Sequence, residues 1–251
     1  ISSINKIRLF LLDVLINPQF LCKFVKNYIS MRNKIFAILY YSSLLDQIQF
    51  LGTGFVVSKG GFFITAGHTL GQLGQIYLDK GKFRAVFIDD SSNYRSVPFS
   101  TICYKYLSKG KQSPPVLYDI AYGCLKEGEY EYFMVEDKLS NIGEILIAPH
   151  YKSANQSNFL GKSFEDTIDI SLLMYFNPSM SVLKNVNASV LDNEYSNCMQ
   201  LTQSTKIAKG ASGCPLVNTK GYVSGLFVAA SEVDDKRYAL NALSIYELSK
   251  D

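Results

Sequence analysis

The chain has 251 residues, of which 47% are hydrophobic and 19% are charged, and its formal net charge is +3. This balance excludes a disordered chain and favours a well-buried globular protein with one large or two small domains. The positive charges are scattered rather than gathered into a stripe, so we expect no nucleic-acid partner. Five cysteines without CxxC spacing and only two histidines predict a reduced, cytoplasmic protein with no metal site and no cofactor.

Residues 1–32 carry two amphipathic helical patterns, one on each side of Asn17-Pro18. Charged residues interrupt every apolar run, so no segment here could span a membrane, and no small-residue cleavage site marks a signal peptide. We expect a helical N-terminal extension packed on the outside of the protein. Two alternatives stay open, attachment to a membrane surface and an arm that binds a regulatory partner protein.

From residue 33 onward, short apolar segments alternate with turn residues, which is typical of an all-β protein. We divide this part into a first unit, 33–135, and a second unit, 136–251. In the first unit the pattern predicts strands at 34–41, 49–58, 62–65, 75–79, 83–89, 97–106 and 120–125. In the second it predicts a polar loop at 152–166 and strands at 144–149, 168–176, 181–191, 198–202, 215–217, 222–229 and 238–244.

Three residues in these units could share one chemistry. His68 follows an apolar strand, Asp119 opens another, and Ser212 lies between two glycines in a tight turn. A serine hydroxyl is a poor nucleophile at neutral pH and needs an imidazole to take its proton and a carboxylate to orient that imidazole. Taken singly, the three could be a turn residue, a strand cap and a small residue in a glycine-rich turn.

Five segments in order resemble the chymotrypsin-like (trypsin-fold) serine peptidases, and their wording is closest to the bacterial HtrA-type and viral branches. The resemblance covers roughly residues 34–248. The segments are Gly52-Thr53-Gly54-Phe55-Val56-Val57, Thr65-Ala66-Gly67-His68, Asp119-Ile120-Ala121, Gly210-Ala211-Ser212-Gly213-Cys214-Pro215-Leu216-Val217 and Gly221-Tyr222-Val223-Ser224-Gly225-Leu226.

The resemblance implies two six-stranded antiparallel β-barrels and a serine endopeptidase that works through an acyl-enzyme. His68 would be the base, Asp119 would orient it, and Ser212 would be the nucleophile. The main-chain N–H groups of Gly210 and Ser212 would form the oxyanion hole. Ala211 stands where zymogen-activated relatives carry an aspartate, so we expect other contacts to shape this loop.

The same resemblance places the specificity pocket in residues 202–209 and 225–230. The candidate substrate-binding residues are Thr202, Lys206, Gly225, Leu226, Phe227 and Val228. No Asp or Glu occurs between Tyr195 and Ser231, so we expect a preference for apolar or small side chains before the scissile bond. Lys206 could instead attract an acidic side chain. The later strand would pair with an extended protein or peptide substrate.

Other functions remain open at this point. The chain could be a catalytically silent pseudopeptidase that only binds peptides, or a protein-docking module that uses its N-terminal helices. Cys214 could be a rival thiol nucleophile, although its place two residues beyond Ser212 favours a buried small residue.

Overall fold

The computed structural model of the protein describes residues 30–42, 46–70, 81–88, 93–105, 119–126, 128–154, 158–160, 174–190, 195–202, 210–230 and 237–248. The N-terminal extension therefore lies outside the described residues, apart from a helical turn at 30–32. The strand predicted at 75–79 also lies outside them. No helix in the described ranges is long and apolar enough to cross a membrane.

The first half of the chain forms an antiparallel sheet whose six strands pair in a ring. The order is β1-β4-β5-β6-β3-β2, and β1 also pairs with β2. A seventh strand, β8, comes from the second half of the chain and pairs with residues 47–49 of β2. The strands are β1 (Ile35–Ser42), β2 (Gln47–Val56), β3 (Phe62–Thr65), β4 (Gly81–Ile88), β5 (Tyr94–Lys105), β6 (Ile120–Leu125) and β8 (Asn158–Leu160).

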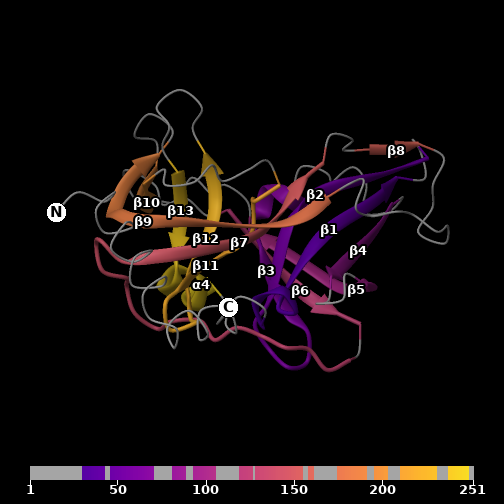
Figure 1. The fold of residues 1–251 in the computed structure, drawn as a ribbon, viewed down its shortest axis with the longest axis horizontal. Helices are drawn as coiled ribbons and strands as arrows, with labels where there is room; N and C mark the ends of the chain where they lie inside the picture. Colours follow the sequence, from indigo (N-terminus) through magenta and orange to yellow (C-terminus); the bar gives the residue numbers. More distant parts are fainter. Residues whose placement is uncertain are drawn as a thin grey trace, which may run out of the picture.

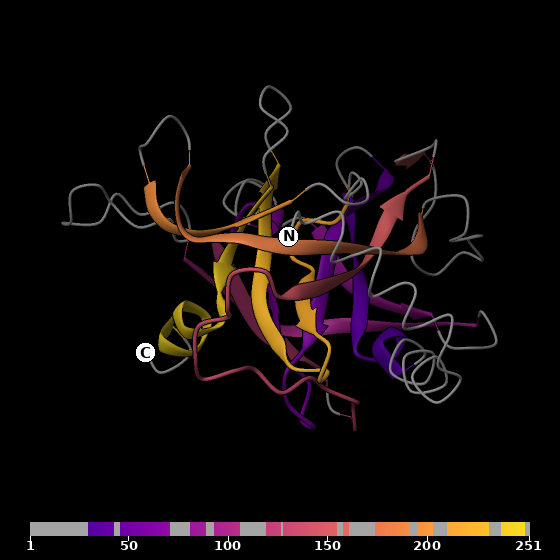
Figure 2. The same cartoon turned by 60° about the vertical axis from the view of Figure 1, so that its left-hand side comes forward.

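The second half forms a closed antiparallel barrel in the order β10-β13-β12-β11-β7-β9. Figures 1 and 2 show it beside the first sheet, so the prediction of two six-stranded antiparallel barrels is confirmed. A short helix, α4 (Ala242–Leu248), follows the last strand. The strands are β7 (Ile145–Ser153), β9 (Met174–Val190), β10 (Tyr195–Leu201), β11 (Pro215–Asn218), β12 (Val223–Ala230) and β13 (Arg237–Asn241).

Phenylalanine rings fill the interior of the first sheet. Phe36 packs edge-on against Phe63 with ring centroids 5.4 Å apart, and Phe63 lies 4.7 Å from Phe99. A Cβ atom at Gly54 would come within 2.6 Å of the Phe36 ring, so β2 accepts only glycine there. This close packing fixes β2 against β1 and therefore sets the position of the neighbouring residue Thr53.

The strand pattern was wrong in detail at three places. The segments 168–176 and 181–191 were predicted as separate strands, but β9 runs unbroken through Pro178, which lies opposite Pro149. In this register the Tyr151 N–H of β7 bonds to Thr53 and the Val182 N–H of β9 bonds to Thr202, each away from the partner strand. The alternation places the two prolines at positions of the same kind, so they remove no hydrogen bond between β7 and β9. The predicted loop 152–166 contains β8. The predicted strand 238–244 turns into α4, because Ala242 and Ile245 bury a helical i, i+3 face.

Candidate active site

His68 and Asp119 meet because their strands are neighbours. β3 ends at Thr65 and β6 begins at Ile120, and the antiparallel register sets Thr65 opposite Ala121. His68 lies just past the end of β3, in a helical turn at 67–70, while Asp119 lies just before β6. The two side chains thus project from the same end of the strand pair.

Two hydrogen bonds join them. The distance from His68 Nδ1 to Asp119 Oδ2 is 2.6 Å, and the His68 main-chain N–H donates to Asp119 Oδ1 at 2.6 Å. The Asp119 side chain is 8% exposed and that of His68 is 32% exposed. An ionised carboxylate only accepts, so Nδ1 carries the proton and Nε2 is left as the basic nitrogen of the ring.

Ser212 occupies a tight turn. The Cys214 N–H donates to the Ala211 carbonyl at 2.9 Å, and Gly213 has a φ of 86°. An i to i+3 hydrogen bond with positive φ at the third residue is the signature of a type II turn. Ser212 is the second residue of that turn, half-buried, so its hydroxyl group projects from a rigid corner.

The turn lies against the strands that lead to His68. A Cβ atom at Gly213 would collide with the Thr65 hydroxyl and would come within 2.8 Å of the Ala66 nitrogen. Across the lobes, the Ser212 carbonyl accepts the Thr53 N–H at 2.9 Å. Among the described residues no hydrogen bond joins Ser212 Oγ to the His68 ring. A hydrogen bond between a base and the hydroxyl it deprotonates is often long or absent when no substrate is bound.

The two N–H groups predicted to form the oxyanion hole have no hydrogen-bond acceptor among the described residues. Neither the Gly210 N–H nor the Ser212 N–H donates to another described group. Gly210 has a φ of 102°, and a Cβ atom there would collide with the Phe50 ring and approach the Tyr151 carbonyl to 2.9 Å. Only glycine fits this conformation and this space.

Sequence reasoning missed Thr53, which joins the two lobes behind Ser212, and Thr65, which holds Thr53 within the first lobe. Thr53 is fully buried, and its hydroxyl lies between the Gly210 carbonyl and the Tyr151 N–H. The Thr65 hydroxyl donates to the Thr53 carbonyl at 2.7 Å. The available signal was a polar residue between two glycines in an otherwise apolar strand.

The predicted specificity residues do not all lie together. Phe227 contacts the turn, because its N–H donates to the Cys214 carbonyl at 3.0 Å and its carbonyl accepts the Gly213 N–H at 2.9 Å. Val228 follows it and is 2% exposed.

The remaining specificity candidates are placed differently. Gly225 and Leu226 have strand partners on both sides, in β11 and β13, so their main chain is already paired. Thr202 bonds to Val182 of β9 through its N–H and hydroxyl. Lys206 lies outside the described residues.

Cys214 is wholly buried, and burial raises the pKa of its thiol far above its usual value. A thiol that stays protonated is neither a nucleophile nor a metal ligand. Burial likewise raises the pKa of Cys198 to about 12. Cys214 therefore packs beneath the turn as a small apolar residue.

His150, the other histidine, has a structural environment in β7. It is fully buried, and this burial lowers its pKa to about 4. Its Nδ1–H donates to the Ala148 carbonyl at 2.8 Å, and its Nε2 accepts from the Asn177 amide at 3.1 Å. Among the described residues, no group of three His, Cys, Asp or Glu side chains could hold a metal ion.

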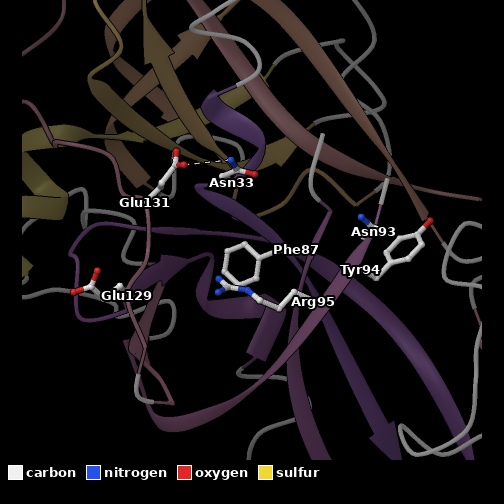
Figure 3. Close-up of a pocket in the computed structure, with 7 residues that line it drawn as sticks. All are labelled: Asn33, Phe87, Asn93, Tyr94, Arg95, Glu129 and Glu131. Carbon is white, nitrogen blue, oxygen red and sulfur yellow. Dashed lines mark hydrogen bonds between the residues drawn. The ribbon is translucent and has the colours of Figure 1, made fainter. Parts of the chain in front are cut away.

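The first lobe has a cavity of about 300 Å³, and Figure 3 shows the residues that line it. Beside it the Arg95 guanidinium lies between the rings of Phe87 and Tyr130, at 4.8 and 5.0 Å. The Tyr130 N–H donates to Lys59 in the turn before β3, at the end of that strand remote from His68. This cavity contains no predicted site residue. Its lining is Asn33, Phe87, Asn93, Tyr94, Arg95, Glu129 and Glu131.

Comparison with known proteins supports the fold. No protein-family model and no curated sequence matches the chain. The crystal structure of Deg5 has a TM-score of 0.61 with 14% identity, over 90% of this chain and 91% of that one. The MamO protease domain from Magnetospirillum magneticum has a TM-score of 0.59 with 13% identity, over 89% of this chain and 100% of that one.

A third similar structure is the active form of the Rv3671c protease from M. tuberculosis. Its TM-score is 0.59 with 12% identity, over 88% of this chain and 81% of that one. At these identities the likeness concerns the fold, which is that of trypsin-like serine proteases of the HtrA/Deg type. The resemblance stated from the sequence is thereby confirmed at the level of the fold.

Proposed function

We propose that the protein is a serine endopeptidase that uses His68, Asp119 and Ser212. The single observation that carries the proposal is the pair of 2.6 Å hydrogen bonds by which Asp119 holds the His68 ring and main chain. That arrangement leaves Nε2 as the proton acceptor, in a lobe whose strands pack directly against the turn of Ser212. An orienting acid, a tautomer-fixed base and a serine on a rigid turn are the parts that acyl transfer requires.

In the proposed reaction Ser212 Oγ attacks the peptide carbonyl while Nε2 of His68 takes the hydroxyl proton. The C–N bond then breaks, the amine leaves with that proton, and an ester to Ser212 remains. Water next attacks the ester and gives a proton to Nε2 of His68. The bond between the carbonyl carbon and Ser212 Oγ then breaks, His68 returns the proton to Ser212 Oγ, and the carboxylic acid leaves. Asp119 stays ionised throughout and stabilises the imidazolium.

The negative oxygen of each tetrahedral intermediate would be bound by the N–H groups of Gly210 and Ser212. Neither group donates to another described residue, so no bond among the described residues must break before they bind the oxygen. Loss of one such donor costs about 3 to 4 kcal/mol of transition-state stabilisation in related chemistry.

We further propose a preference for apolar or small side chains before the scissile bond. The strand beside the turn carries the apolar residues Phe227 and Val228, and no acidic residue occurs between Tyr195 and Ser231 to attract a basic side chain. A mass-spectrometric cleavage profile on a random peptide mixture tests this preference. Cleavage after Arg or Lys would contradict it.

Labelling by a fluorophosphonate probe tests the nucleophile. The wild-type protein should react at Ser212, and Ser212→Ala should abolish the labelling. Ser224→Ala is the matched control, because it removes a buried hydroxyl that bonds to Glu136 at 2.7 Å, away from the turn. Equal labelling of wild type and Ser212→Ala would refute the assignment.

One observation favours a second candidate, a catalytically silent peptide-binding protein. As described above, Ser212 Oγ and the His68 ring share no hydrogen bond among the described residues. A silent protein would bind peptides from a mixture without cutting them, and it would resist the probe at every pH. Turnover of any peptide that is lost in Ser212→Ala removes this candidate.

A further inference from the structure

We propose that Thr53 is a positioning residue that sets the geometry of the oxyanion loop from the opposite lobe. This inference rests on the proposed function, since it concerns the same site. Thr53 lies in β2 of the first sheet, whereas every group it positions belongs to the second half of the chain. No chemical step uses its hydroxyl, so its effect must pass through the main chain of residues 210–213.

Three of its hydrogen bonds reach the second half directly. The Thr53 N–H donates to the Ser212 carbonyl at 2.9 Å, and its hydroxyl donates to the Gly210 carbonyl at 3.0 Å. The same hydroxyl accepts the Tyr151 N–H at 3.0 Å. The Thr65 hydroxyl in turn holds the Thr53 carbonyl at 2.7 Å. One buried residue therefore links β2 and β3 to the turn and to β7.

The hydroxyl both donates and accepts a hydrogen bond at this site. A threonine hydroxyl has one proton to donate, which goes to Gly210, and it accepts one proton from Tyr151. Thr53 is 0% exposed, so water does not compete for either bond. Removal of the hydroxyl would take this partner from the buried Tyr151 N–H and from the part-buried Gly210 carbonyl, and the loss is most costly at the buried N–H.

The bonds fix two peptide planes around the nucleophile. The Gly210 carbonyl belongs to the peptide between residues 210 and 211, and the Ser212 carbonyl belongs to the peptide between 212 and 213. Between these planes lies the peptide that carries the Ser212 N–H. The Phe50 ring and the Tyr151 carbonyl occupy the space beside Gly210, so the loop has little room to rotate on that side. Thr53 holds the loop by its hydrogen bonds to Gly210 and Ser212.

The hydrogen bonds from Thr53 hold the loop in place of a polar side chain at position 211, which this sequence lacks. Ala211 is 1% exposed and has no polar side chain to hold the loop from within. The loop is instead held from β2, at a sequence distance of 157 residues from Gly210. The sequence predicted that contacts other than an aspartate at position 211 shape this loop, and Thr53 supplies such a contact.

The test compares Thr53→Val, which keeps the shape and loses the hydroxyl, with Thr53→Ser, which keeps the hydroxyl. We expect Thr53→Val to lower kcat by about 10- to 100-fold with little change in KM, since a misplaced catalytic geometry costs on that order. Thr53→Ser should restore most of kcat. Ser224→Ala, the control, should lose thermal stability while its kcat stays at the wild-type value.

A second measurement keeps the proposal separate from the proposed function. Amide hydrogen exchange reports the bond from Tyr151 to Thr53 whether or not the protein cuts peptides. Thr53→Val should speed exchange about tenfold or more at Tyr151 and, within residues 210–213, at Gly213, whose N–H donates to the Phe227 carbonyl, and it should leave Val223 unchanged. If Thr53→Val does not fold, the same comparison is made with Thr53→Ala at a temperature below its Tm.

The kinetic and exchange measurements together distinguish a positioning role of Thr53 from a role in stability alone. Lost kcat with faster local exchange, both rescued in Thr53→Ser, supports the positioning role. Unchanged exchange at residues 210–213 overturns it, even in a protein that proves inactive. Wild-type kcat in Thr53→Val with only a lower Tm also overturns it, because the hydroxyl would then serve stability alone.

Discussion

Asp119 holds His68 at two atoms, with one carboxylate oxygen on the ring Nδ1 and the other on the main-chain N–H, each at 2.6 Å. The ring and the backbone of the helical turn at 67–70 are therefore oriented by a single side chain. That side chain is 8% exposed, so solvent does little to weaken either bond.

Asp119→Asn should lower kcat by roughly 10⁴-fold, as the loss of the orienting acid does in related triads. The amide N–H of the variant can donate a hydrogen bond to Nδ1. The ring proton would then lie on Nε2, which could no longer act as the base. Steady-state kinetics at pH 7 to 9 measure the loss, with thermal unfolding as the check on folding. A loss below tenfold would show that Asp119 does not set the tautomer.

Gly213→Ala should destabilise the protein far more than Gly221→Ala. The two glycines have similar φ angles, 86° and 91°, but a Cβ atom at Gly213 collides with Thr65 and Thr53, whereas nothing lies within 4 Å of one at Gly221. Gly221→Ala should cost only the backbone strain, about 1 to 2 kcal/mol. Urea unfolding of both variants measures the difference, and equal losses would contradict the close approach.

The free energy of unfolding should fall as the pH drops from 6.5 to 4. Burial lowers the pKa of His150 to about 4 in the folded protein, from its usual value of 6.5. Because the unfolded chain binds the proton more tightly, acid favours unfolding over this range, by about 2 to 3 kcal/mol in total.

His150→Gln should remove that part of the pH dependence. Its side chain does not titrate, yet it can still accept from the Asn177 amide that now bonds to Nε2. The measurement is the difference in unfolding free energy between pH 7 and pH 4.5 for both proteins. Parallel losses in wild type and variant would mean that other groups cause the acid sensitivity.

Glu136→Gln should lower the unfolding free energy by about 1 to 3 kcal/mol without a change in kcat. The Glu136 carboxylate accepts from the Asn218 amide at 2.8 Å and from the Ser224 hydroxyl at 2.7 Å. In the variant one of these donors faces an NH₂ group. Asp137→Asn, at an exposed neighbouring position, is the control and should be close to neutral in urea unfolding.

The fold and the pairing of His68 with Asp119 could be predicted because short local sequence patterns indicate both. Each strand shows its apolar residues, and the register of β3 with β6 brings the two motifs together. The role of Thr53 could not be predicted, because its hydroxyl partners lie 98 and 157 residues away. Nothing in the local pattern around residue 53 tells which distant carbonyl its hydroxyl will meet.

The misassigned segments have a similar cause. β8 is too short to show an alternation of its own, and it becomes a strand only because β2 offers an open edge at residues 47–49. α4 was mistaken for strand because seven residues hold too few repeats to separate a period of two from one of 3.6. In both cases the tertiary neighbours decide the conformation.

The origin of β8 has a consequence for how the two halves of the chain depend on each other. A fragment that stops after β6 would keep the ring of six strands but would expose the main chain of Gln47–Gln49, where β8 now pairs. Uncovered strand edges recruit other chains and promote aggregation. The first lobe therefore depends on a segment made later in translation to cover this edge.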